Sequence, residues 1–303
     1  MNNYQPPLGG KELKAATFEF TAWLLKKIEN EQCGHFSVFD KWCASIIERL
    51  TKIGPEKDWA ESVAEAAAAS PQGRSFAGDF FRWRLFLDRW KQGRFVTYNQ
   101  REESGINYVP RFGTEFGSDV FIMAQGAPHI MRWRGLPLMK TVFDFALYPR
   151  MLDEIRPQTL FEIGSGFGAS ALWFSDLLKI SGSNAHVHSV DIKLVDRKHE
   201  GVSFYQGDCE KPDTLFPPEH LQTAPHPWLV IEDAHHNVLE VLGYMHGFLK
   251  TGDYLVVEDS DIKKDAIKRF TADHPGLYMV DTRYTDYFGR NATCSNDSIF
   301  TRL

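Results

Sequence analysis

Three carboxylates form the most chemically suggestive group in the sequence. Asp233 follows the apolar run 228–231 after one intervening Glu, and Glu258 and Asp259 directly follow the apolar run 254–257. If these runs are neighbouring strands, the three side chains converge, and crowded carboxylates repel one another unless a cation joins them. Oxygen ligands with room for water suit Mg²⁺ or Mn²⁺, and no cysteine is placed to favour zinc. We therefore predict a divalent-cation site here; the alternative is a set of solvated loop acids that cap helices.

Two histidines, His235 and His236, come almost directly after the first of these acids. A neutral imidazole beside a bound metal can take a proton from a hydroxyl group near neutral pH. A purely structural hydrogen bond is the alternative role for either ring. The residues alone do not choose which histidine is the general base.

A glycine-rich turn, Glu162-Ile163-Gly164-Ser165-Gly166-Phe167-Gly168-Ala169, follows another apolar run. Glycines allow the backbone to turn tightly and approach a ligand, and the helix that follows offers free N–H groups. The same spacing also fits a dinucleotide fingerprint. The turn therefore predicts the binding of a nucleotide-like cofactor without identifying it.

Three further acids help to choose the cofactor. Asp191, after the run 187–190, suits the hydroxyls of a ribose in either case. Glu162 would repel a pyrophosphate but suits the ammonium and sulfonium-bearing end of S-adenosylmethionine. Asp208, after the run 202–205, can meet an adenine amino group, and no Tyr-x-x-x-Lys dehydrogenase signature is present. These features favour S-adenosylmethionine over NAD.

The elements that position these residues alternate along the chain after residue 140. The apolar runs are 160–163, 187–190, 202–205, 228–231 and 254–257, and the helical segments are 169–178 and 238–248. Short apolar strands that alternate with helices predict a parallel sheet with helices on both faces. Ligands of such sheets bind at the carboxyl ends of the strands, where the acids fall.

The first third of the chain has a different pattern. Apolar residues recur at helical spacing through residues 10–92, which predicts a helical N-terminal domain, residues 1–105, before an α/β domain, residues 106–303. We expect the first domain to act as a lid, a wall of the substrate site or an oligomer contact. Its aromatic residues, with Tyr98, Tyr108 and Phe112, can cover a large hydrophobic acceptor, although a plain helical core is the alternative.

Composition narrows the class of protein. Hydrophobic residues make up 43% and charged residues 24%, as in ordinary globular proteins. The net charge is −6, with the acidic excess after residue 100, which argues against a nucleic-acid partner. The chain shows no signal peptide, no membrane-spanning run and no disulfide spacing. We expect a cytoplasmic protein with a small-molecule acceptor and, by default, a homo-oligomer.

Several of these segments together resemble the cephalosporin hydroxylase family. That family consists largely of methyltransferase-fold proteins and includes rhamnosyl O-methyltransferases; macrolide-sugar O-methyltransferases of the macrocin and mycinamicin type are related. The resemblance covers roughly residues 130–303. The motifs that carry it are Trp133-x-Gly135, Arg156-Pro157, the glycine turn, Asp233-x-x-His236, Glu258-Asp259 and the tail Phe288–Thr293, which looks like the closing strand of the family.

The resemblance implies a fold and a set of roles. The fold is a Rossmann-like class I S-adenosylmethionine-dependent methyltransferase sheet, with Mg²⁺ (or Mn²⁺) at Asp233, Glu258 and Asp259 and with His236 as the base. Together with the residues themselves it predicts a cofactor site at Glu162, Gly164, Ser165, Gly166, Ser170, Asp191 and Asp208. The sequence departs from the family inside Asp233-x-x-His236, which reads Ala-His where relatives have Gly-Ser or Ser-Asp, and at Gly168-Ala169-Ser170, where many have Gly-Gly-Ser.

These observations favour a Mg²⁺-dependent O-methyltransferase that acts on a hydroxyl of a natural product, such as a sugar, in secondary-metabolite or antibiotic biosynthesis. Two alternatives remain open. One is a NAD(P)-dependent oxidoreductase that uses the same glycine turn. The other is a non-catalytic accessory protein of a biosynthetic pathway.

Overall fold

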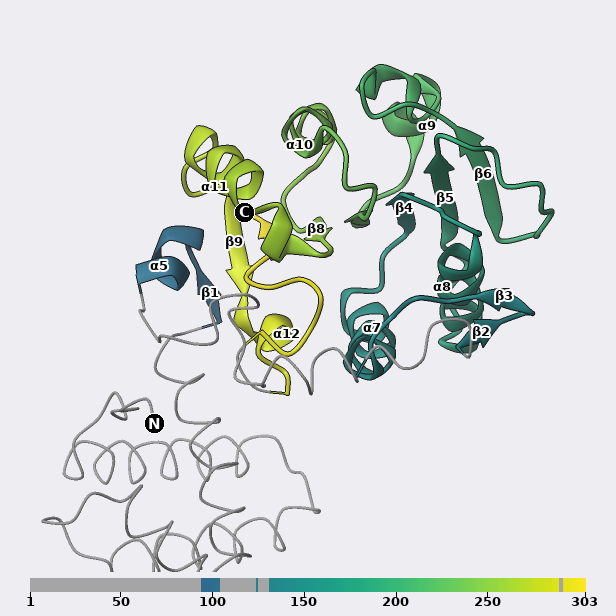
Figure 1. The fold of residues 1–303 in the computed structure, drawn as a ribbon, viewed down its shortest axis with the longest axis horizontal. Coiled ribbons are helices and arrows are strands. Elements are labelled where there is room, and N and C mark those ends of the chain that lie inside the picture. The colour runs from purple at the N-terminus through teal and green to yellow at the C-terminus, as the bar shows by residue number, and fades with distance from the viewer. Residues whose placement is uncertain (1–93, 104–123, 125–130, 289–290) are drawn as a thin grey trace, which may run out of the picture. The chain divides into compact units, whose positions relative to one another are not determined.

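The computed structural model describes residues 94–103, 124, 131–288 and 291–303 (Figure 1). The chain divides into two compact units, Met1–Gly93 and Arg94–Leu303. The expected helical segment 10–92 lies outside the described residues, as do Tyr108 and Phe112. The second unit begins before residue 106, the expected boundary, because the segment that starts at Arg94 supplies a strand to its sheet.

An 8-stranded sheet forms the centre of this unit, in the order β1-β9-β10-β8-β7-β4-β5-β6. Its strands are β1 (Phe95–Val96), β4 (Thr159–Ile163), β5 (His186–Asp191), β6 (Val202–Gln206), β7 (Trp228–Glu232), β8 (Tyr254–Val257), β9 (Tyr278–Asp281) and β10 (Ile299–Arg302). Strands β4 to β8 are parallel, and they confirm the five strands predicted from the apolar runs.

The sheet is mixed rather than purely parallel, because β10 is antiparallel to both β8 and β9, and β1 is antiparallel to β9. The expectation that Phe288–Thr293 forms the closing strand was wrong, because Phe288 and residues 291–293 lie outside any strand; the last strand of the chain is β10, which lies between β8 and β9. Asn291 and Asp297 both adopt a φ of +52°, which an extended strand does not allow. Ile299 and Phe300 follow them and are buried in the sheet.

Helices cover both faces, as predicted (Figure 1). They are α5 (Tyr98–Glu103), α7 (Val142–Ile155), α8 (Ala169–Ile180), α9 (Pro218–Thr223), α10 (Val238–His246), α11 (Lys264–Asp273) and α12 (Thr282–Thr285). Leu160 of β4 packs in a core with α7 and α8, whereas its neighbour Phe161 packs in a second core with α10 and α11. This alternation follows from the two-residue repeat of a strand. None of the helices in the described ranges has the length and hydropathy needed to cross a membrane.

Two features of this architecture position the site. From the central strand β4 the chain builds β5 and β6 on one side, then returns to place β7 and β8 on the other. The loops after β4 and β7 therefore diverge, and a crevice forms at the carboxyl ends of the strands. In addition, α7 begins with a capping box, in which Thr141 and Asp144 each bond the backbone N–H of the other. The cap fixes Lys140 just before the helix.

Candidate active site

A cavity of about 660 Å³ opens at the carboxyl ends of β4, β5, β7 and β8. This volume lies within the range of small-molecule sites. All of the predicted site residues except Glu162 line it: Gly164, Ser165, Gly166, Ser170, Asp191, Asp208, Asp233, His236, Glu258 and Asp259. The apolar part of the lining includes Met131, Leu138 and Met139 from the segment before α7.

The glycine turn after β4 forms one wall of this cavity. Gly164 has a φ of +105°, and a Cβ there would lie 2.7 Å from the backbone of Asp233. The close contact between the loops after β4 and β7 therefore requires glycine. Gly166 has a φ of +51°, and a Cβ added to it would meet no atom within 4 Å, so its backbone faces open space. Its N–H donates to Asp191 Oδ2 at 2.9 Å.

Asp191 and Asp208 continue this wall from the ends of β5 and β6. Asp191 Oδ1 accepts from the backbone of Lys193 at 3.1 Å, and Asp208 Oδ1 accepts from the backbone of Glu210 at 3.0 Å. A carboxylate has about four lone-pair sites, so both groups retain acceptor capacity toward a ligand. The backbone bonds hold each carboxylate in place beside the cavity.

Glu162 is fully buried and is not among the residues that line the cavity. Its Oε2 accepts from Ser189 Oγ, which lies 2.6 Å from the hydroxyl of Ser165, a lining residue. Its Oε1 is buried and makes no hydrogen bond to the described residues. Burial raises the pKa of Glu162 to about 7, against the opposing effect of the neighbouring Ser170 and Ser189 hydroxyls. The hydroxyl groups of Ser189 and Ser165 thus connect the Glu162 carboxylate with the cavity lining.

The acids of the opposite wall are brought together by strand pairing. The N–H of Asp233 donates to Ile163 O at 2.8 Å, and that of Glu258 donates to Glu232 O at 2.9 Å, so each continues its parallel ladder by one residue. Glu232 itself is buried and paired with Lys263 Nζ at 2.8 Å. The sequence therefore predicted correctly that the ends of β7 and β8 are neighbours.

A buried lysine joins two of these acids, which the sequence analysis did not foresee. Lys140 Nζ lies 3.1 Å from Asp233 Oδ2 and also donates to Glu258 Oε2, while the Tyr148 hydroxyl donates to Glu258 Oε1. Burial raises the pKa of Glu258 above its ordinary value. Burial acts in the same sense on Asp233, but the Lys140 ammonium and the His235 ring outweigh it and lower the pKa of that carboxyl. Each oxygen of Glu258 therefore has a partner within the protein.

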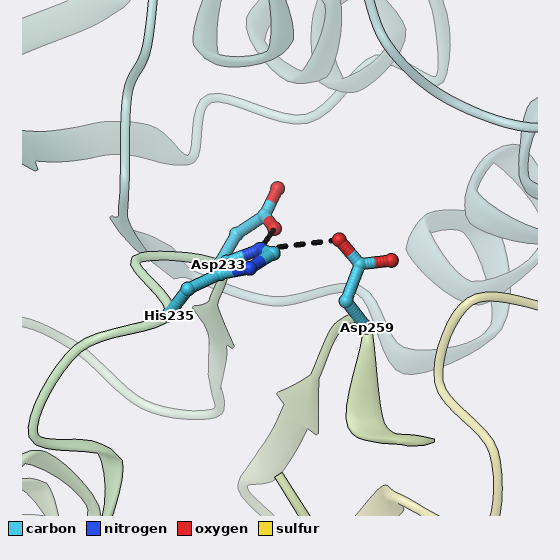
Figure 2. Close-up of side chains that lie close together, drawn as sticks. All are labelled: Asp233, His235 and Asp259. Atoms are coloured by element: carbon cyan, nitrogen blue, oxygen red, sulfur yellow. Dashed lines mark hydrogen bonds and ion pairs between the residues drawn. The ribbon is translucent and has the colours of Figure 1, made fainter. Parts of the chain in front are cut away.

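His235 lies between the other two carboxylates, as Figure 2 shows. Its Nε2 is 3.2 Å from Asp233 Oδ1 and 3.1 Å from Asp259 Oδ2. One potential ligand atom from each of Asp233, His235 and Asp259 falls within 4.8 Å of the others. The hydrogen bonds to the two carboxylates raise the pKa of His235 to about 9. The structure thus groups His235, rather than Glu258, with the two aspartates.

His236 points to a different partner. Its side chain is 64% exposed, and Nε2 lies 2.6 Å from Oε1 of Glu210 at the rim of the cavity. The two consecutive histidines are therefore separated in space by their environments. His235 binds the acids, and His236 remains at the solvent side of the same cavity.

Sequence reasoning missed Lys140, Tyr148 and the bridging position of His235. The pattern Thr141-x-x-Asp144 is a capping signal that predicts the start of a helix just after Lys140. Nothing in the sequence connects that lysine with Asp233. For His235, the Ala-His departure inside the Asp233-x-x-His236 motif was the only available signal.

Comparisons with known proteins give the site a context. The family described as Rhamnosyl O-methyltransferase/CmcI matches residues 127–277. A rhamnosyl O-methyltransferase of Mycobacterium leprae is 30% identical over 177 residues, which cover 52% of this chain and 77% of the relative. The protein of the same name from Mycobacterium tuberculosis is 30% identical over 165 residues, covering 52% of this chain and 66% of the relative.

Solved structures give a similar result. The apo-structure of CmcI has a TM-score of 0.50 at 27% identity and covers 71% of this chain and 98% of that one. A structure of CmcI with Mg and S-adenosylmethionine has a TM-score of 0.49 at 26% identity, covering 71% and 99%. MycE from the mycinamycin pathway has a TM-score of 0.33 at 22% identity, covering 42% and 35%. The likeness to the CmcI apo-structure supports the mixed α/β fold.

Proposed function

The chain belongs to the rhamnosyl O-methyltransferase/CmcI family and is an S-adenosylmethionine-dependent O-methyltransferase, and on this basis we propose that it methylates a hydroxyl group of a natural product with the help of a divalent cation. A sugar hydroxyl is the first acceptor class to test, because the named relatives are rhamnosyl O-methyltransferases. One observation carries the proposal. The glycine turn and the acids at the ends of β7 and β8 line a single cavity, so donor and acceptor can meet there.

The glycine-turn wall fits S-adenosylmethionine. Gly166 leaves open space above its backbone, and the Asp191 carboxylate beside it can accept bonds from two ribose hydroxyls. Asp208 lies farther along the same wall, where an adenine amino group can donate to it. Glu162 lies beneath this wall: its Oε2 accepts from Ser189 Oγ, which lies 2.6 Å from Ser165 Oγ, so its carboxylate acts through these hydroxyls rather than by direct contact. When bound, S-adenosylmethionine supplies an activated methyl group, so the protein mainly has to align the acceptor.

The opposite wall fits a divalent cation. Asp233 and Asp259 offer carboxylate oxygens, and Glu258 stands beside them. A bound cation would orient the acceptor oxygen and lower the pKa of its hydroxyl group. Lys140 and Tyr148 hold Glu258, and Lys140 also holds Asp233, so the carboxylates keep their positions without mutual repulsion. These residues preorganise the wall before a ligand arrives.

His236 is the proposed general base. It lines the cavity beside the acids, and the Glu210 carboxylate accepts a hydrogen bond from its Nε2. That bond favours the tautomer with the proton on Nε2, which leaves Nδ1 able to accept the acceptor's proton. Met131, Leu138 and Met139 provide an apolar surface for the carbon skeleton of the acceptor.

A binding and transfer assay tests this function. Calorimetric titration of the purified protein with S-adenosylmethionine and with NAD should show binding of the first alone. Methyl transfer from labelled S-adenosylmethionine to rhamnosylated and other glycosylated acceptors should require Mg²⁺ or Mn²⁺ and stop in EDTA. Full transfer in EDTA would refute the role of the cation. Cofactor binding without transfer to any acceptor class would favour the accessory-protein alternative.

A further inference from the structure

We propose that His235 is a nitrogen ligand of the divalent-cation site and that the site consequently binds Mn²⁺ in preference to Mg²⁺. This inference rests on the proposed function, because it concerns the same cation. The inference extends the proposed function by naming a ligand and an ion. The three groups involved, Asp233, His235 and Asp259, are drawn in Figure 2.

The distances within this group suit a shared ion. His235 Nε2 is 3.2 Å from Asp233 Oδ1 and 3.1 Å from Asp259 Oδ2. Two neighbouring ligands of an octahedral ion, each about 2.1 Å from it, lie roughly 3.0 Å apart. The imidazole nitrogen and the two oxygens are therefore spaced as ligands of a single ion would be.

Within the described ranges, this group is the one whose potential ligand atoms lie close enough together to share an ion. Lys140 donates to Asp233 Oδ2, and the other oxygen, Oδ1, lies 3.2 Å from His235 Nε2. Glu258, the third predicted carboxylate, has one oxygen bonded to Lys140 and the other to Tyr148. His235 thus occupies the third position that the sequence analysis assigned to Glu258.

The backbone holds His235 and Asp259 in an unfavourable conformation. His235 has a φ of +61° and Asp259 a φ of +47°, and neither is a glycine. Such left-handed conformations are unfavourable for a residue with a Cβ and persist where the surroundings enforce them. Two of the three donor residues adopt this conformation.

The donor chemistry determines the preferred ion. Mg²⁺ is a hard cation that is bound mainly by oxygen, whereas imidazole suits transition ions better. Replacing one carboxylate oxygen with a neutral nitrogen therefore weakens the site for Mg²⁺ relative to Mn²⁺. In a different arrangement, a charged His235 ring neutralises the two aspartates and competes with the metal. Removal of the ring would then tighten metal binding instead of weakening it.

Metal binding by four forms of the full chain separates these arrangements. Calorimetry with Mg²⁺ and Mn²⁺ should be made on the wild type, His235→Ala, His235→Asn and His236→Ala. Asparagine tolerates a left-handed backbone and serves as the second variant if His235→Ala fails to fold. His236→Ala is the matched control, because it removes the adjacent imidazole, whose Nε2 binds Glu210 rather than the acids.

We expect the wild type and His236→Ala to bind Mn²⁺ about tenfold or more tightly than Mg²⁺, and both His235 variants to lose that preference. Pulsed electron paramagnetic resonance of the Mn²⁺-loaded protein should show coupling to a ligand nitrogen in the first two forms and none in the His235 variants. Unchanged or tighter binding of both ions in the His235 variants, or absence of nitrogen coupling in the wild type, would overturn the inference.

The experiment also separates this inference from the proposed function. If no form binds either ion and methyl transfer proceeds in EDTA, the cation role itself fails. If both ions bind equally and support transfer, and the wild type shows no nitrogen coupling, the cation role stands and His235 is not a ligand.

Discussion

The two walls of the cavity are built in different ways. The glycine-turn wall depends on backbone conformation: Gly164 and Gly166 have positive φ values, and Gly166 donates a backbone bond to Asp191. The opposite wall depends on charged side chains, with Lys140 between Asp233 and Glu258. The glycines of the first wall are neighbours in sequence, and Asp191 lies 25 residues from Gly166. The second needs a lysine that lies 93 residues from its partner Asp233.

This difference determines which substitutions each wall tolerates. A backbone wall fails when a side chain is added, because there is no space or no permitted conformation for it. A charged wall fails when a side chain is removed, because a buried charge is left without its partner. The two walls meet where Gly164 touches the backbone of Asp233.

Asp233→Asn should have the largest effect on activity. The change removes the carboxylate shared by Lys140 and His235, and a bound cation contributes several kcal/mol, so kcat/KM for methyl transfer should fall roughly 1000-fold. Asp265→Asn, an exposed acid on α11, is the matched control and should retain activity. Near-normal, metal-dependent transfer by Asp233→Asn would show that the charged wall does not hold the cation.

Lys140→Met should mainly reduce stability. It leaves Asp233 and Glu258 without their buried cation, which typically costs about 3 kcal/mol of unfolding free energy in a urea titration. Adding Glu258→Gln should recover part of the loss, because one of the two unpaired charges is then absent. An unchanged urea midpoint for Lys140→Met would mean that the wall does not rely on charge compensation.

His236→Ala should separate catalysis from binding. Removal of a general base lowers kcat about 100-fold. The affinity for S-adenosylmethionine should change little, since His236 contacts Glu210 and not the glycine turn. Steady-state kinetics and calorimetry measure the two quantities. A kcat close to that of the wild type would show that another group acts as the general base.

Gly164→Ala and Gly166→Ala form a matched pair on the backbone wall. Both residues have positive φ, so alanine is strained at each by about 1 kcal/mol. Only at Gly164 would the new Cβ also collide with Asp233, at 2.7 Å. The free energy of unfolding of Gly164→Ala should therefore be about 2 kcal/mol lower than that of Gly166→Ala. Equal losses would indicate that the loops can separate freely.

A third region, around His188 in the middle of β5, should control part of the response to acid. His188 stacks on Phe161 and binds Tyr205, and burial, followed by the charges of His186 and His220, lowers its pKa to about 4. An unfolded histidine has a pKa near 6.5, so the unfolded state gains a proton first. The stability from the neutral His188 ring is complete above about pH 6.5 and falls as the pH drops toward 4.

His188→Gln should therefore lose less stability between pH 7 and pH 5 than the wild type. The expected difference is about 1 kcal/mol, after allowing for the partial exposure of the ring. Urea titrations at the two pH values measure it. An identical loss in both proteins would assign the acid sensitivity to the carboxylates of the cavity instead.

The sequence predicted the features that depend on local pattern and strand pairing. The five parallel strands are confirmed, and parallel pairing places the acids after β7 and β8 in one cavity with the glycine turn. It did not predict the partners of those acids. Lys140 reaches them through the tertiary packing of α7, and the left-handed backbone at His235 turns its ring away from that of His236. Neither effect leaves a periodic signal.

The closing strand shows the same limit. The segment 288–293 was chosen on resemblance, but two residues with positive φ interrupt extension until β10 begins at Ile299. Likewise, the boundary at residue 106 followed from the helical spacing of apolar residues in the first third of the chain. The structure places the start of the compact unit at Arg94, because strand pairing determines which segment belongs to the sheet.

The short strand β1 also covers one edge of the sheet. Phe95 and Val96 pair with β9, and Arg94 and Arg101 attach the segment through Asp281, Asp286 and Asp297. A two-residue edge offers few unpaired backbone groups to a strand from another molecule, which protects a sheet against aggregation. A chain shortened to begin after Glu103 would expose the longer edge of β9, whereas one that begins at Arg94 keeps it covered.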